Sequence, residues 1–130
     1  MNLRAESIAF KALLATGCLL ALCGLGGCDI AVNEFELSPP DDSTIWVELY
    51  NSGDEAVNID GWLIKIVDEA WEGPIYLEGS IEPRGFLALD GQESWMVTGN
   101  GTVYLYDASG RQVDKTPLHG DNEHTDYTYG

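Results

Sequence analysis

Turn-forming residues recur so often after residue 28 that they leave room only for short strands. Gly, Asn, Asp and Pro come about every 8–12 residues, and no segment between them keeps a helical period for more than a turn or two. Short apolar or alternating runs fill the intervals. The pattern predicts strands at residues 30–37, 44–51, 57–59, 62–67, 74–77, 86–89, 102–106 and 111–115.

Two of these segments specify how the strands are oriented. Thr44–Asn51 alternates between apolar residues on one side and Trp, Glu and Tyr on the other. In Ile30–Leu37 the apolar set slips phase between Val32 and Phe35, which predicts a β-bulge at residues 33–34.

Seven or eight such strands in about 100 residues predict an all-β fold of the immunoglobulin-like β-sandwich type. The expected core is Val32, Phe35, Val47, Leu49, Ile59, Trp62, Ile64, Ile66, Leu77, Leu87, Val103, Leu105 and Val113.

The N-terminal segment has a different character. The apolar run Ala12–Gly27 is 16 residues long, whereas a membrane-spanning helix needs about 20, and the end of the run is rich in glycine. Arg4 and Lys11 supply positive charge on the N-terminal side of this run. This arrangement is typical of a cleaved secretory signal peptide at residues 1–27. A short core or amphipathic helix is the alternative, but the run has no polar face.

The three cysteines indicate a modification site rather than a disulfide. Cys18 and Cys23 lie in the apolar run and leave with the signal peptide, so Cys28 remains as the single thiol. Leu25–Cys28 resembles the bacterial lipobox. The resemblance implies cleavage before Cys28, acylation of its sulfur, and anchoring in a lipid bilayer of the bacterial cell envelope. Asp29 resembles the inner-membrane retention signal of some Gram-negative lipoproteins, and the choice between the two membranes stays open.

Charge limits the partners of the remaining chain, residues 28–130. It contains 21 acidic and four basic residues, a net charge of −17. Such a surface repels phosphate backbones, so nucleic acid is not an expected partner. Four Trp, six Tyr and three Phe in the whole chain favour a folded domain over disorder.

Five segments carry a family resemblance: "IAVNEFEL", "WVELYN", "VNIDGWLI", "IEPRGFLAL" and "VYLYDASGRQVD". In order and spacing they resemble the lamin tail domain family over roughly residues 30–116. The resemblance implies an immunoglobulin-like sandwich with a non-catalytic interaction role. Arg84 stands where the family usually has glycine. The chain ends at Gly130, short of the family's final Gly-Arg-x-Pro-Asp-Gly segment, so we expect a truncated domain with an open edge near Arg111–Lys115 that pairs with another chain.

Candidate site residues are few. Trp46 and Tyr50 share the polar side of one strand and could bind a sugar or a partner strand, although cross-strand packing is the favoured interpretation. Glu34 and Glu48 could form a carboxylate pair for acid/base work, but no nucleophile motif accompanies them, and we expect no enzyme.

A metal site has weak support in the sequence. The candidate ligands are His119, Asp121, Glu123, His124 and Asp126. Their spacing fits neither a helical His pair nor an EF-hand loop, so a solvated terminal loop without metal or cofactor is expected.

Two functional interpretations follow. The first is a non-catalytic, lipid-anchored, extracytoplasmic binding or structural module that contacts a protein or another envelope component. The alternative is a divalent-metal module that binds calcium through acidic loops at residues 41–42, 54–55 and 121–126.

Overall fold

A computed structural model describes residues 29–37, 45–68, 71–90, 95 and 100–120. Within these ranges the protein is all-β, with no helix, and its paired strands run antiparallel. The expected all-β class is therefore confirmed. The strands are β1 (Ile30–Glu36), β2 (Trp46–Asn51), β3 (Val57–Asn58), β4 (Leu63–Asp68), β5 (Trp71–Tyr76), β6 (Ser80–Ile81), β7 (Phe86–Asp90), β8 (Asn100–Tyr106), β9 (Gln112–Lys115) and β10 (His119–Gly120).

The first sheet has three strands in the order β1-β2-β7. Strand β2 lies at its centre, and Val47 of β2 stands opposite both Phe35 of β1 and Leu89 of β7. The register of β1 against β2 shifts between Val32 and Glu34, which confirms the predicted bulge. The alternation of β2 places its apolar side chains inward and its Trp, Glu and Tyr outward.

The second sheet has five strands around β8. One edge of β8 pairs with β4, and the other edge is shared by β10 at its start and β9 at its end. Between these two partners, the Thr116 hydroxyl accepts the Val103 N–H (3.0 Å), so the edge remains bonded across the break. Pro117 follows directly and has no N–H to continue the ladder. The sequence analysis did not predict β10.

Strand β5 begins three residues earlier than expected. The sequence analysis placed its start at Pro74, yet Pro74 lies inside β5 and stands opposite Lys65. Within the described residues, β5 pairs only with β4, and an edge strand tolerates proline because its outer side needs no donor.

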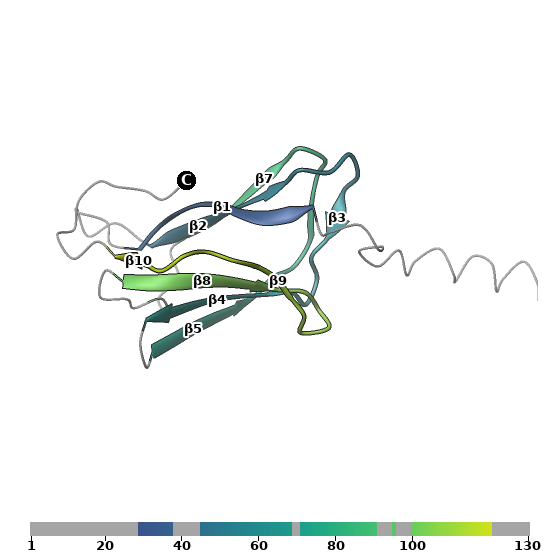
Figure 1. Cartoon of the computed structure of the whole chain (residues 1–130). Helices are drawn as coiled ribbons and strands as arrows, with labels where there is room; N and C mark the ends of the chain where they lie inside the picture. Colours follow the sequence, from purple (N-terminus) through teal and green to yellow (C-terminus); the bar gives the residue numbers. More distant parts are fainter. Residues whose placement is uncertain (1–28, 38–44, 69–70, 91–94, 96–99, 121–130) are drawn as a thin grey trace, which may run out of the picture.

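The two sheets lie one above the other with the core between them (Figure 1), as in a β-sandwich. Ten of the thirteen expected core residues are buried, and Val32, Leu87 and Val113 are partly buried against them. Val32 is at the bulge, while Leu87 and Val113 lie on strands that pair on one side. Four further buried residues were not predicted: Ile30, Leu37, Ile81 and Trp95.

A small two-stranded sheet, β3 with β6, lies at the end of the sandwich where β1 begins (Figure 1). The turn after β3 is held by Asp60, whose carboxylate accepts the Gly79 N–H (2.6 Å) and a bond from the Asn58 amide (3.1 Å). These bonds, that to Gly79 first, lower the pKa of Asp60. Gly61 follows with a φ of 74°, which glycine adopts without strain.

Candidate functional site

The predicted face of Trp46 and Tyr50 lies on the outer side of the three-stranded sheet. Both residues are partly buried, and β2 places them four positions apart on the same side. The neighbour of Tyr50 is Phe86 of β7, directly opposite in register, with ring centroids 4.6 Å apart and an interplanar angle of 27°. This contact is cross-strand packing. Because Phe86 remains 58% exposed, the stacked pair also presents an aromatic surface to solvent.

Arg84 lies in the turn that leads to this aromatic pair. Its guanidinium donates to the Asp54 carboxylate (2.8 Å), and the two side chains are 60% and 88% exposed. The hydrogen bond to Asp54, followed by one to Tyr50, raises the pKa of Arg84. Its φ is 56°, the only positive value among the described non-glycine residues. The position that resembles the family's glycine is therefore one where glycine would relieve strain.

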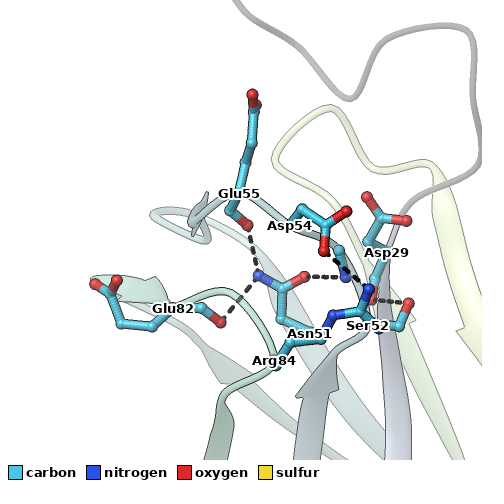
Figure 2. A network of polar contacts seen from close by, with 8 residues as sticks. Asp29, Asn51, Ser52, Asp54, Glu55, Glu82 and Arg84 are labelled. Atoms are coloured by element: carbon cyan, nitrogen blue, oxygen red, sulfur yellow. Dashed lines mark hydrogen bonds and ion pairs between the residues drawn. The ribbon is translucent and has the colours of Figure 1, made fainter.

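Asn51 holds the loops behind Arg84 (Figure 2). Its side chain is fully buried, and its amide nitrogen donates to the carbonyls of Glu55 (2.8 Å), Ile81 (3.0 Å) and Glu82 (3.1 Å). Its amide oxygen accepts the Gly53 N–H (2.9 Å). One side chain thus joins the loop after β2 to the turn before β7. The network is structural, because it leaves no donor of that amide for a ligand.

Asp29 joins the same end of the sandwich. Its carbonyl oxygen accepts the Ser52 N–H (2.8 Å) and the Ser52 hydroxyl (3.1 Å), as Figure 2 shows for the side chain. Ile30, the next residue, is buried and stands opposite Asn51. Cys28 and the predicted signal peptide lie outside the described residues, and the first strand, β1, begins at Ile30, two positions after Cys28.

A second aromatic surface, which the sequence analysis missed, lies on the outer side of the five-stranded sheet. We name it the Tyr–Lys face: Lys65, Tyr104, Tyr106 and Lys115. The two tyrosine rings are 6.2 Å apart and nearly parallel. The ammonium of Lys65 lies 5.9 Å from the centroid of the Tyr106 ring, and that of Lys115 lies 5.1 Å from the centroid of the Tyr104 ring. Cations attract the negative faces of aromatic rings at such distances.

The cations of the described chain differ in how they are paired. Lys65 pairs with Glu72 (3.3 Å), Arg84 with Asp54 and Arg111 with Asp107 (3.0 Å). Lys115 makes no ion pair with any described carboxylate. Alternation along residues 102–106 signals that both tyrosines point outward, but only the pairing of β4, β8 and β9 brings the lysines beside them.

The weak metal candidates are not assembled by the part of the structure that is described. The sequence analysis expected His119 in a solvated loop, and this is wrong: His119 is buried in β10, and its ring meets Phe35 edge to face with centroids 5.4 Å apart. His119 is buried because β10 pairs with β8. Residues 121–126 and 41–42 lie outside the described residues. Among those described, no three ligand-type side chains gather into a group that could hold a metal ion.

The two carboxylates considered as an acid/base pair are brought together in register, and both residues are partly buried. Glu34 and Glu48 stand opposite each other in β1 and β2, and the Asn33 amide donates to Glu48 (2.8 Å) at an exposed position.

Comparisons with known proteins add no assignment. The sequence matches no protein-family model, and no curated protein matches it at a significant level. No helix within the described residues is long and apolar enough to cross a membrane.

Proposed function

We propose that this chain is a non-catalytic, lipid-anchored, extracytoplasmic binding module with an immunoglobulin-like sandwich of lamin-tail type. Residues 1–27 serve as its signal peptide, and Cys28 carries the acyl chains that hold it at the bacterial cell envelope. Stable anchoring requires more than one chain, which a diacylated and N-acylated cysteine supplies.

The resemblance to lamin tail domains is supported by what its motif residues do. Asn51 joins two loops, Asp60 holds the turn after β3, and Asp107 holds the β8–β9 hairpin. Asp114, at the end of the last motif, accepts the Val32 N–H (2.9 Å) at the bulge and so links the two sheets. These four motif residues therefore each have a structural role, which favours shared architecture over chance.

The Tyr–Lys face is the observation that carries the binding role. It combines two neighbouring tyrosines with Lys115, which among the described lysines and arginines is the one without an ion pair to a described carboxylate, in a chain with 21 acidic residues after position 28. Tyrosine offers a large rigid contact surface at low entropic cost, and lysine adds attraction to a carboxylate or phosphate of a partner.

Two measurements test the proposal. Acyl-chain metabolic labelling marks the wild-type chain, and Cys28→Ala abolishes both the label and the processing. A photoreactive phenylalanine analogue at position 104 forms cross-links to an envelope component in cells, whereas the same analogue at Leu118, which is 75% exposed, forms fewer. Normal processing of Cys28→Ala would disprove the anchor, and absence of cross-links at position 104 would disprove the binding face.

A further inference from the structure

The distance between the proposed anchor and the folded domain is unusually well defined. Asp29 is held through its carbonyl by Ser52, and Ile30 already belongs to β1 and is buried. Consecutive Cα atoms are about 3.8 Å apart, so an acylated Cys28 has no slack. Acyl chains on that residue bring the adjoining end of the sandwich to the headgroup layer.

At that end lies a group of side chains that we name the anchor corner: Asp29, Tyr50, Asp54, Arg84 and Phe86. Asn51 and Ile30 form the last paired row of the first sheet, and Tyr50 and Phe86 form the next row on its outer side. Arg84 and Asp54 form an ion pair there, and Asp29 is bonded through its carbonyl to Ser52, two residues before Asp54 (Figure 2).

We propose that the anchor corner is a lipid-binding surface that seats the domain on zwitterionic headgroups. This proposal rests on the acylation of Cys28 proposed above. It adds a specific partner, the bilayer surface itself, and specific residues that contact it.

The chemistry of the corner matches both charges of such a headgroup. The Arg84 guanidinium is 60% exposed, and its fork geometry suits two phosphate oxygens. Asp54 is 88% exposed and can accept hydrogen bonds from the ammonium of a phosphatidylethanolamine. Phe86, 58% exposed and stacked on Tyr50, is of the kind that settles at the boundary between headgroups and acyl chains. With two carboxylates beside one guanidinium, the corner disfavours a purely anionic surface.

The backbone conformation of Arg84 indicates that its side chain has a function of its own. A φ of 56° is unfavourable for arginine and free of strain for glycine. A strained residue at an exposed position indicates that its side chain does something which the local fold does not require. An exposed ion pair such as that with Asp54 contributes less stability than the backbone strain costs. Binding of a headgroup phosphate would be a function that the Arg84 side chain serves in spite of this strain.

The test uses the processed chain whose acyl mass on Cys28 has been verified, reconstituted in vesicles of phosphatidylethanolamine and phosphatidylcholine. Hydrogen exchange over residues 50–56 and 82–87 should be slower by about threefold or more than in vesicles of phosphatidylglycerol alone. Exchange over residues 100–102 and 118–120, where β10 pairs with the start of β8 at the other end of the sandwich (Figure 1), should be the same in both.

Arg84→Gly separates lipid contact from folding because the two readouts move in opposite directions. We expect the melting temperature in detergent to rise, while the slower exchange in zwitterionic vesicles is lost. Lys115→Gln removes a cation elsewhere and should leave the exchange difference unchanged. For the aromatic part, Phe86→Ser should reduce the difference, whereas Leu118→Ser, at an apolar residue that is 75% exposed, should not.

Three results would overturn the proposal: Arg84→Gly that retains the full exchange difference, equal protection on anionic vesicles, or protection centred on residues 100–102 and 118–120. A chain without acyl mass on Cys28 would instead disprove the anchor, and the lipid contact that rests on it would fall with it. The cross-linking at position 104 does not depend on any of these outcomes.

Discussion

Two turns of this domain each need one residue in the left-handed backbone conformation, and they meet the need differently. The β8–β9 hairpin uses Gly110, with a φ of 83°, whereas the turn before β7 uses Arg84, with a φ of 56°. Glycine adopts this conformation freely, and arginine does so at a cost on the order of 1–2 kcal/mol. The two turns are also held by different means.

The hairpin is held by its own residues. The Asp107 carboxylate accepts bonds from the Ser109 hydroxyl (2.6 Å), the Ser109 N–H (2.9 Å) and the Arg111 N–H (3.1 Å). These bonds, that from the Ser109 hydroxyl first, lower the pKa of Asp107. Every partner lies within four residues, so the turn is specified locally.

The turn before β7 depends on a distant residue. Gly85 N–H donates to the Glu82 carbonyl (2.9 Å) within the turn, but Asn51 on β2 accounts for the bonds to the Ile81 and Glu82 carbonyls. Asn51 is 30 residues from Ile81 and 31 residues from Glu82 in the sequence. A turn that is supported by tertiary contacts can therefore tolerate a locally unfavourable residue. A turn that is held only by its own residues has no such support.

Asn51→Ala should have the largest effect because it removes the distant support of the second turn. It removes the Asn51 bonds to the Glu55, Ile81 and Glu82 carbonyls and to the Gly53 N–H, while the Glu82 carbonyl keeps its bond from the Gly85 N–H. Lost bonds of this kind cost about 1 kcal/mol each, so the melting temperature should fall by roughly 10 °C or more. Asn58→Ala, at an exposed position in the same region, is the control and should lower it by far less. Equal losses would show that Asn51 is not the link between the loops.

Gly110→Ala tests the glycine of the first turn. No atom lies within 4 Å of the added methyl group, so the cost is that of the backbone alone, about 1–2 kcal/mol. Chemical denaturation should show this loss. Gly110→Asn should lose less because asparagine tolerates the left-handed conformation. A neutral Gly110→Ala variant would mean that the hairpin can relax into another turn type.

Arg84→Gly is the reverse substitution in the second turn. We expect a smaller change of opposite sign: the melting temperature rises, since strain is relieved, but the ion pair with Asp54 is lost and the unfolded chain gains freedom. Arg84→Ala keeps the strain and loses the ion pair, so it should not stabilise. If alanine stabilised as much as glycine, the backbone strain would not be the cause.

Lowering the pH should also distinguish the two turns, with the smallest of the expected changes in melting temperature. Asp107 has a folded-state pKa below its ordinary value of 3.8, so its contribution is fully present above that value and is lost as pH falls through the lower folded value. The melting-temperature difference between wild type and Asp107→Asn should therefore shrink between about pH 5 and about pH 2. The deficit of Asn51→Ala should persist over that range because an amide does not titrate. A parallel decline of both would contradict the comparison.

Much of the fold could be predicted because its signals are local. Alternation along residues 45–50 sets which side of β2 is buried, the phase slip at Val32 marks the bulge, and Asp107 with Gly110 marks a hairpin. Strand β10 and the burial of His119 could not be predicted, because a two-residue strand has no pattern of its own and exists only through pairing with β8.

The candidate surfaces divide in the same way. That Trp46 and Tyr50 point outward was readable from alternation, but Phe86 as the partner of Tyr50 depends on the pairing of β2 with β7. The Tyr–Lys face requires three strands from residues 63–68, 100–106 and 112–115 to lie side by side. Sequence patterns carry no information about which strands pair.

By itself, then, the sequence determined the strand content, the inward set of apolar residues and the self-contained turns, because each follows from steric preferences and hydrophobic periodicity over a few residues. Only the tertiary structure decided which side chains share a surface, why Asn51 is buried and how Arg84 keeps a left-handed backbone. Those features depend on contacts between residues 30 or more positions apart, such as Asn51 with Ile81 and Arg84 with Asp54, which form when the sheets pack.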